Sequence, residues 1–269
     1  MSYRLLVCDL DGTLLDNPPD LDPALVDGLR RAMERGLAFT IATGRMPLGT
    51  ARYRDELGVT APVVFYNGAL VRDHEAGRDL MTLTLPRGIL WQAHDVFAHA
   101  PVDPLFYRDD QLYCLAESFP VRTYSQDQRV PLEVVDAPSE FLRMGGFVKT
   151  LLIGHPASLP AVRAELGAVV GDAARLVMTR TDYLEIIPTA ASKGAALAFL
   201  AGHLGIPLAE TIAVGDQEND LDMIRAAGLG IAMPGAPETV RAAAGRVAPP
   251  DEEGGLLELF TELLPEYFA

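Results

Sequence analysis

Short apolar runs recur along the chain and stop abruptly at polar or turn residues. One run begins at Leu5 and ends before Asp9, and others cover 37–42, 63–66 and 211–214. A continuous apolar run of this length is typical of a strand that is buried on both faces of a sheet. The pattern therefore predicts a largely parallel, buried sheet.

Stretches with helical spacing separate these runs. Residues 21–36 repeat an apolar side chain at every fourth position, carry Asp22-Pro23 at the expected cap and first turn, and end at Gly36. This alternation of strand and helix predicts an α/β fold with a doubly wound parallel-sheet core, which is Rossmann-like. The other helices expected in the core cover 47–57, 195–204, 221–227, 237–244 and 256–264, and one more strand is expected at 229–233.

The middle of the chain follows a different pattern. Residues 69–85 alternate around a turn at 75–77, which predicts a hairpin. Beyond them, hairpins and helices mix in the manner of an α+β domain. We therefore expect the core to occupy 1–85 and 189–269 and an inserted cap domain to occupy 86–188. Within the insert, helices are expected at 89–99 and 157–170 and strands at 105–108, 111–116, 147–153, 175–179 and 183–187.

Polar side chains follow the predicted core strands where each strand ends. In open α/β sheets, ligands bind outside the carboxyl ends of the strands. Each pair such as Thr43-Gly44 or Asn67-Gly68 is also a common turn, so it is the shared placement that indicates a site. The candidate residues are Asp9, Asp11, Thr43, Gly44, Asn67, Lys193, Asp216, Asn219 and Asp220.

Asp9 and Asp11 stand two residues apart, and in extended chain their side chains would point the same way, roughly 6–7 Å apart. Two carboxylates that close need a cation between them, or one of them keeps a proton. An EF-hand also begins D-x-D, but it needs glycine at the sixth position, and Gly12 is the fourth. Hard oxygen ligands without nearby Cys or His favour Mg²⁺, an ion often used with phosphate.

Composition and charge exclude several classes of function. The formal net charge is -15 and the pI is near 4.7, which argues against nucleic acid or an anionic membrane surface as a partner. No apolar run reaches about 18 residues and no signal-peptide layout is present, so we expect a cytoplasmic protein. The two cysteines are too few for a disulfide framework. Of 22 basic residues, only Lys149 and Lys193 are lysines.

Four motifs in order resemble those of the haloacid dehalogenase superfamily of phosphatases. They are Asp9-Leu10-Asp11-Gly12-Thr13-Leu14-Leu15, Thr43-Gly44-Arg45, Lys193, and Gly215-Asp216-Gln217-Glu218-Asn219-Asp220. Asn67-Gly68-Ala69 and the long insert resemble the Cof-like subfamily, whose α/β cap lies at this place. One departure is Met233-Pro234-Gly235-Ala236, where that subfamily usually has a Gly-Asn pair before the alanine.

The resemblance implies a role for each motif residue. Asp9 would be the nucleophile that forms an aspartyl-phosphate, and Asp11 the general acid and then base. Mg²⁺ would be held by the Asp9 carboxylate, the Asp11 backbone carbonyl and Asp216. The remaining roles follow in the same way: Asn219 and Asp220 would order the metal's waters or Lys193, and phosphate or substrate would be bound by Thr43, Gly44, Arg45 and Asn67.

The function expected on this basis is Mg²⁺-dependent hydrolysis of small phosphorylated metabolites, such as sugar phosphates or cofactor phosphates. One alternative is a phosphosugar-specific phosphatase or a phosphomutase of the same superfamily. A non-catalytic binding module on the same fold is another, and loss of a motif residue would favour it. None of the motif residues is lost.

Overall fold

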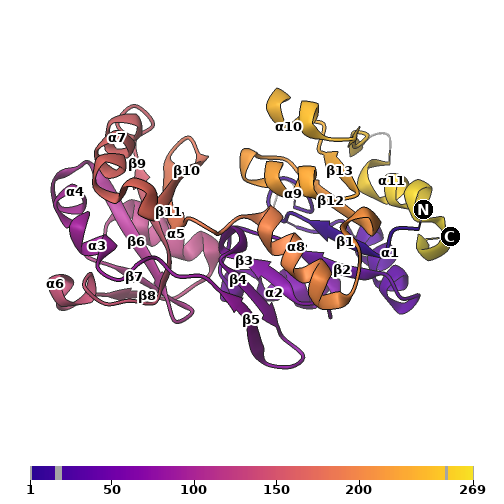
Figure 1. Ribbon diagram of the computed structural model, residues 1–269, viewed down its shortest axis with the longest axis horizontal. Helices are drawn as coiled ribbons and strands as arrows, with labels where there is room; N and C mark the ends of the chain where they lie inside the picture. Colours follow the sequence, from indigo (N-terminus) through magenta and orange to yellow (C-terminus); the bar gives the residue numbers. More distant parts are fainter. Residues whose placement is uncertain (1, 16–19, 252–253, 269) are drawn as a thin grey trace. The chain divides into compact units, whose positions relative to one another are not determined.

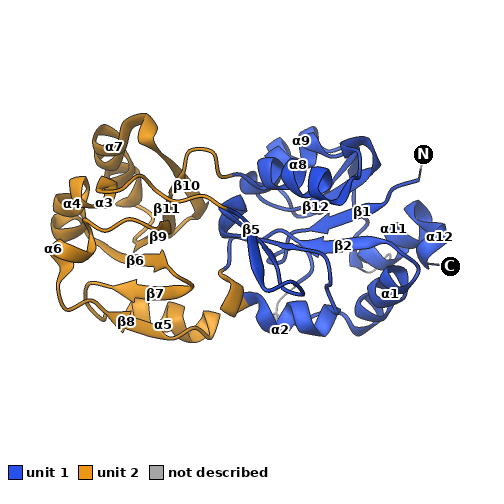
Figure 2. Cartoon of the chain, turned by 60° about the horizontal axis from the view of Figure 1, so that its bottom comes forward, with its two compact units in different colours: residues 1–45, 50–81, 192–269 blue, residues 46–49, 82–191 orange. Residues whose placement is uncertain are grey.

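The computed structural model describes residues 2–15, 20–251 and 254–268. Its contacts divide the chain into two compact units (Figure 2). Unit 1 comprises Met1–Arg45, Thr50–Met81 and Ser192–Ala269, and unit 2 comprises Met46–Gly49 and Thr82–Ala191. The chain passes between the units after Arg45, Gly49, Met81 and Ala191. The limits of 86 and 188 expected for the insert stay a prediction.

A parallel sheet with the strand order β14-β13-β12-β1-β2 forms the centre of unit 1 (Figure 1). Strand β1 (Leu5–Cys8) lies between β12 and β2 in the sheet, and all four of its residues are buried. This confirms the α/β class and the prediction that the first apolar run is a buried strand. The other strands are β2 (Ala38–Ile41), β12 (Thr211–Gly215), β13 (Leu229–Ala232) and β14 (Arg246–Val247).

Helices cover both faces of this sheet (Figure 2). Leu5 and Val7 pack with α8 (Lys193–Leu204) and α9 (Leu221–Ala226) in one apolar core. The predicted cap of the first helix is confirmed, because the Asp22 side chain accepts a hydrogen bond from the Ala24 amide at 3.0 Å. The remaining helices of the core are α1 (Pro23–Glu34), α2 (Pro47–Leu57), α10 (Glu238–Ala243), α11 (Gly255–Leu263) and α12 (Pro265–Phe268).

After α2 the chain forms a small sheet with the strand order β3-β4-β5. Its strands are β3 (Val63–Phe65), β4 (Leu70–Asp73) and β5 (Arg78–Thr82), and β3 pairs antiparallel with β4. Val64 also forms a parallel bridge with Ala42, directly after β2. The carboxyl end of β3 therefore lies beside that of β2.

Unit 2 is built on a sheet with the order β10-β11-β9-β6-β7-β8. Four helices pack on one face of it, and Phe106, Leu152 and Ile186 from the sheet contribute to the core between them. The strands are β6 (Val102–Arg108), β7 (Gln111–Cys114), β8 (Leu132–Val134), β9 (Phe147–Gly154), β10 (Ala174–Arg180) and β11 (Tyr183–Pro188). The helices are α3 (Ile89–Gln92), α4 (His94–His99), α5 (Phe119–Gln128), α6 (Pro138–Phe141) and α7 (Leu159–Val170).

The expectation of one helix over 89–99 is wrong, because the segment breaks at Ala93 into α3 and α4. The His94 ring stacks on Trp91 with centroids 4.0 Å apart, and its Nδ1 lies 2.6 Å from the Trp91 carbonyl oxygen. That carbonyl would accept from residue 95 in an unbroken helix, so the histidine side chain competes with the helical hydrogen bond.

The sequence analysis also missed α5, α6 and β8. A signal for α5 was present, since Ser118 caps the helix and Pro120 stands in its first turn. Strand β8 has only three residues and a largely exposed pattern, which leaves no periodicity to read. Within the described ranges, no helix has the length and apolar character needed to cross a membrane.

Candidate active site

Two carboxylates follow neighbouring parallel strands at the same edge of the main sheet. Asp9 comes directly after β1 and Asp216 directly after β12, and the register pairs Cys8 with Val214. The Asp9 amide donates to the Val214 carbonyl oxygen at 2.9 Å, which continues the ladder past the end of the strand. Both carboxylates are nearly buried. The register of the sheet therefore places them together.

Lys193 lies beside these carboxylates and comes from a third element of the fold. It is the first residue of α8, whose N-cap Ser192 accepts a hydrogen bond from the Ala195 amide at 3.1 Å. The Lys193 ammonium donates to Asp9 Oδ1 and to Asp220 Oδ1, each at 2.6 Å. Its side chain has no exposed surface. One ammonium thus holds one carboxylate that precedes it in the sequence by 184 residues and one that follows it by 27.

Asp220 organises the loop that follows β12. Its Oδ2 accepts hydrogen bonds from the amides of Asp216 and Gln217, both at 2.9 Å. A Cβ on Gly215 would lie 2.5 Å from the Asp220 Cβ, so the loop closes only around a glycine at that position. Both Asp220 oxygens are therefore already engaged within the protein.

Asp216 has its own supporting contacts. The Gln217 side-chain amide donates to Asp216 Oδ2 at 2.8 Å, and the Thr13 hydroxyl lies 3.5 Å from Oδ1. Gly12 has φ of 83°, and a Cβ there would lie 2.4 Å from Asp216 Oδ2. The sequence analysis assigned no role to Thr13 or Gln217, although each stands inside a motif next to a predicted carboxylate.

The charges of this group do not balance. Burial raises the pKa of the Asp9 carboxyl well above its ordinary value. The Lys193 ammonium opposes this rise, and the carboxylates of Asp220 and Asp216 add to it. Burial by itself would lower the pKa of Lys193, but Asp220 and Asp9 outweigh it and raise the pKa, so the lysine stays charged. Three carboxylates facing one ammonium favour the approach of a further cation.

The donor set fits a divalent hard cation. Oxygens of Asp9, Asp216 and Asp220 all lie within 4.8 Å of one another and are buried. Carboxylate oxygens are the ligands that Mg²⁺ prefers, and a divalent ion would relieve the excess negative charge. Since Lys193 and the two loop amides already occupy Asp220, Asp9 and Asp216 are the carboxylates better placed to hold it.

Asp11 does not join this carboxylate group. Strand β1 ends at Cys8, so the extended geometry expected to bring the Asp11 side chain beside that of Asp9 does not continue to Asp11. The Asp11 carboxylate is half exposed and forms a two-point ion pair with Arg45, whose Nε donates to Oδ2 at 2.8 Å. The Arg45 guanidinium also lies 5.3 Å from the centre of the Tyr53 ring.

Thr43, Gly44 and Asn67 lie together at the ends of β2 and β3. The Asn67 amide donates to the Thr43 carbonyl oxygen at 3.0 Å, and a Cβ on Gly44 would lie 3.0 Å from Asn67 Oδ1. Asn219 Nδ2 donates to the same Asn67 oxygen at 3.0 Å. Asn67 has φ of 55°, in the left-handed region that asparagine tolerates better than most residues. Asn219 is thus tied to the Thr43 loop.

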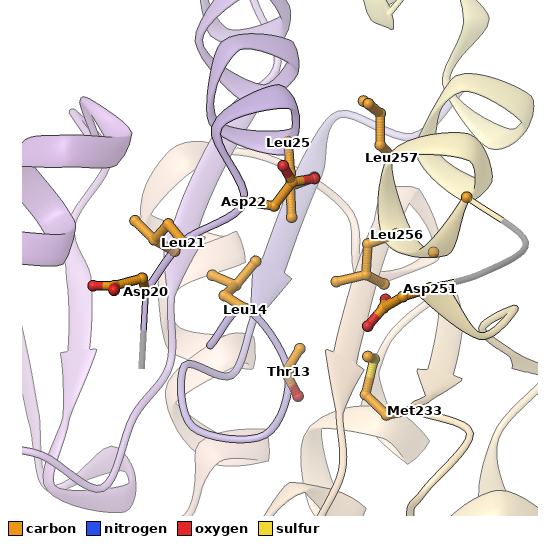
Figure 3. A pocket seen from close by; sticks show the side chains of 12 residues that line it. Thr13, Leu14, Asp20, Leu21, Asp22, Leu25, Met233, Asp251, Leu256 and Leu257 are labelled. Atoms are coloured by element: carbon orange, nitrogen blue, oxygen red, sulfur yellow. The ribbon is translucent and has the colours of Figure 1, made fainter. Parts of the chain in front are cut away.

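A cavity of about 410 Å³ lies beside the segment that follows β1 (Figure 3). Leucines from that segment, from the start of α1 and from the start of α11 form its apolar wall, with Thr13 and Met233 at one end. Asp9 and Lys193 are not among the described residues that line it, but Thr13, whose hydroxyl lies 3.5 Å from Asp216 Oδ1, is. Met233, where the sequence departs from the subfamily pattern, borders the cavity. Its amide donates a hydrogen bond to the Gly215 carbonyl oxygen at 3.0 Å.

Comparisons with known proteins bear on this geometry. A family model of haloacid dehalogenase-like hydrolases matches residues 6–260. YxeH of Bacillus subtilis (strain 168), named as a phosphatase, is 32% identical over 251 residues, which cover 90% of this chain and 91% of that protein. The HMP-PP phosphatase of Shigella boydii serotype 4 (strain Sb227) is 30% identical over 244 residues, covering 89% and 91%. The crystal structure of a haloacid dehalogenase-like hydrolase from Bacteroides thetaiotaomicron superposes with a TM-score of 0.89 at 25% identity, covering 97% of this chain and 100% of that chain.

Proposed function

The chain belongs to the haloacid dehalogenase-like hydrolases and is a phosphatase, and from this premise we propose that it is a Mg²⁺-dependent phosphomonoester hydrolase that works through an aspartyl-phosphate on Asp9. The observation that carries the proposal is the double hydrogen bond of Lys193 to Asp9 and Asp220. These bonds hold the buried Asp9 carboxylate, at the edge of the sheet, beside a fixed positive charge, which attack on a phosphate anion requires.

Asp9 and Asp11 would divide the chemistry. An Asp9 oxygen forms the new bond to phosphorus while the bond from phosphorus to the leaving oxygen breaks. Asp11, which takes up a proton from water when substrate displaces it from Arg45, gives that proton to the leaving oxygen. Asp11, now a carboxylate, then takes a proton from water, whose oxygen bonds to phosphorus and releases Asp9 with inorganic phosphate. The half-exposed position of Asp11 is suited to exchanging protons with a leaving alcohol and with water.

Asp9, Asp216 and the main-chain carbonyl of Asp11 would hold the magnesium ion. When bound, Mg²⁺ supplies positive charge that lowers the repulsion between a carboxylate and a phosphate dianion. Lys193 opposes the same repulsion from its buried position and keeps Asp9 oriented. Asp220 and Asn219 position the surrounding groups, Asp220 through Lys193 and the loop amides and Asn219 through Asn67.

The phosphoryl oxygens would be bound by the Thr43 hydroxyl and the Gly44 amide, with Asn67 beside them. Arg45 would contact phosphate or substrate, and because its guanidinium is held by Asp11, substrate binding would compete with that ion pair. The relatives named as phosphatases support a small phosphorylated metabolite as the substrate, with sugar phosphates and cofactor phosphates the first classes to try.

Phosphate release from p-nitrophenyl phosphate, measured with Mg²⁺, with Ca²⁺ and with EDTA, tests the metal requirement. We expect activity with Mg²⁺, much less with Ca²⁺ and none with EDTA, because the larger ion accepts more ligands and a looser geometry. Equal turnover in EDTA would contradict the metal requirement.

Two substitutions test the division of roles. Asp9→Asn removes the attacking charge at nearly constant shape, so phosphoenzyme should not form. Asp11→Asn should still permit attack on substrates with good leaving groups but slow the water step, so a hydroxylamine-sensitive acyl phosphate should accumulate on Asp9. Mass spectrometry after rapid quench detects it, with Asp27→Asn on the exposed side of α1 as the control. A phosphoryl group on another residue, or full activity of Asp9→Asn, would refute the mechanism.

A further inference from the structure

The turn that follows β3 has an unusual backbone. Tyr66, Asn67 and Gly68 have φ of 52°, 55° and 94°, so three successive residues adopt the left-handed region. Glycine adopts this region freely and asparagine tolerates it, but for a bulky side chain such as that of Tyr66 it is an outlier. Strained backbone of this kind persists only where the surrounding structure holds it, and it is concentrated at functional sites. We call residues 66–68 the left-handed turn.

The left-handed turn is bonded to two of the four motifs. The Tyr66 amide donates to the Arg45 carbonyl oxygen at 3.1 Å. The Asn67 amide donates to the Thr43 carbonyl oxygen at 3.0 Å. Asn219 of the fourth motif donates through Nδ2 to Asn67 Oδ1, also at 3.0 Å. The turn thus connects the loop after β2 with the loop after β12.

A third contact joins the left-handed turn to the start of α8. A Cβ on Gly68 would lie 2.1 Å from the Ser192 carbonyl oxygen and 3.1 Å from the Lys193 amide nitrogen. The same carbonyl accepts a hydrogen bond from the Ala196 amide at 3.0 Å, in the first turn of the helix. Because the contact is with backbone, no change of rotamer can make room for a side chain at position 68. The turn therefore touches the peptide that leads into Lys193.

Gly77 shows what a left-handed glycine requires when it only makes a turn. It has φ of 62° in the hairpin between β4 and β5, and a Cβ there would meet nothing within 4 Å. At Gly68 the left-handed conformation is combined with a backbone contact to another element, which a simple turn does not require. The Lys193 ammonium depends on that element, because it forms two hydrogen bonds of 2.6 Å to carboxylates. A Cβ on Gly68 would displace the start of α8 by about 1 Å, and a displacement of this size can reduce catalysis by about 10²-fold.

We propose that the left-handed turn is a positioning element of the active site, an inference that rests on the proposed phosphatase function. Gly68 offers no side chain to a substrate, and it places Lys193 through the Ser192 peptide. Asn67 places Asn219 through the hydrogen bond between their side chains. All of these residues belong to unit 1. One turn thereby holds the second, third and fourth motifs together.

Steady-state kinetics on p-nitrophenyl phosphate with Mg²⁺ test the link between Gly68 and Lys193. Gly68→Ala should lower kcat by about tenfold to 10²-fold and change KM less, because the start of the helix is displaced. In a Lys193→Met background the same substitution should change kcat by less than about twofold, since the group that it displaces is gone. Gly77→Ala, which introduces a left-handed alanine without a close contact, is the control that should keep kcat.

Asn67→Gly tests the link to Asn219. Glycine fits the left-handed backbone, so this variant keeps the turn and removes only the side-chain acceptor. It should lower kcat/KM by about three- to tenfold, the worth of one hydrogen bond. In an Asn219→Ala background the same substitution should change kcat/KM by less than about twofold, because Asn67 then has no Asn219 amide to hold.

The outcomes separate this inference from the function on which it rests. Wild-type protein that releases no phosphate with Mg²⁺ would overturn the proposed function and the inference together. An active wild type in which Gly68→Ala keeps full activity, or loses the same factor with and without Lys193, would overturn the inference alone. If Gly68→Ala does not fold, Asn67→Gly decides the matter. A loss that disappears in the Asn219→Ala background supports the positioning role, and full activity or an undiminished loss in that background overturns it.

Discussion

Lys193 shows how one residue can depend on distant parts of the chain. Its two carboxylate partners lie 184 residues before it and 27 residues after it. Burial would favour a neutral amine, and the partners reverse that preference. The charge on this side chain is therefore a property of the folded state.

Replacing Lys193 by Met should lower kcat/KM by about 30- to 10³-fold, equivalent to roughly 2–4 kcal/mol of transition-state stabilisation, if the ammonium neutralises phosphoryl charge in a water-poor site. Steady-state kinetics on p-nitrophenyl phosphate measure the change. Arg4→Met, on the exposed surface, is the control. A loss of less than about threefold would remove Lys193 from the reaction.

The two cysteines give a prediction about pH. Burial raises the pKa of the Cys8 thiol well above its ordinary value and also raises that of Cys114. Both thiols therefore stay protonated in the folded protein at pH 8. Their contribution to the free energy of unfolding is complete below the pKa of the thiol in the unfolded chain, and it is lost as the pH rises through the pKa of the thiol in the folded protein. A thiol-reactive disulfide reagent should label neither cysteine in native protein at pH 8 and both in guanidinium. Rapid labelling of the native protein would contradict this.

Helix α8 begins at Lys193, so the way this helix begins matters for the candidate site. Ser192 caps it, and Gly205 ends it with φ of 65°. Gly194 approaches α9 so closely that a Cβ would lie 2.5 Å from the Asp222 carbonyl oxygen. The cap and this close contact together place Lys193 relative to the sheet edge.

Ser192→Ala should lower the free energy of unfolding by about 1 kcal/mol, because the Ala195 amide loses its side-chain acceptor. The matched control is Ser158→Ala: Ser158 stands at the N-cap of α7 but caps no amide with its side chain. Urea unfolding of both variants measures the difference. Equal destabilisation by the two substitutions would mean that the Ser192 hydrogen bond contributes nothing specific.

At the scale of the whole molecule, two units carry separate apolar cores. The core of unit 1 joins β1 and β12 to α8 and α9, and that of unit 2 joins its sheet to α3, α4, α6 and α7. The residues proposed for phosphoryl chemistry lie in unit 1. Chemistry and substrate selection can therefore be tested by changing one unit at a time.

Exchange of the insert tests this division. Replacing 86–188 by the corresponding segment of a relative should change the ranking of phosphorylated substrates while the dependence on Mg²⁺ stays the same. A panel of phosphorylated metabolites, assayed with and without EDTA, measures both properties. If the ranking were unchanged in a folded chimaera, substrate selection would reside in unit 1.

The sequence by itself determined the features that local physics controls. A buried strand shows as a continuous apolar run, so β1 and β12 and the carboxylates Asp9 and Asp216 that follow them could be placed at one sheet edge. The cap at Asp22 and the hairpin of β4 and β5 were equally readable, since their signals lie within a few residues. Short elements such as β8, and the break at Ala93, gave no such local signal.

Only the tertiary structure decided which side chains meet. Asp9 and Asp11 look equivalent in sequence, yet one is buried against Lys193 and the other is held by Arg45, 34 residues away. Nothing in the sequence pairs Lys149 with Glu185, which lies 36 residues away, and only the packing of β9 beside β11 brings the two side chains to 2.8 Å. The physical reason is that strand and helix signals repeat over two to four residues, whereas the partner of a charge is chosen by packing across the whole chain.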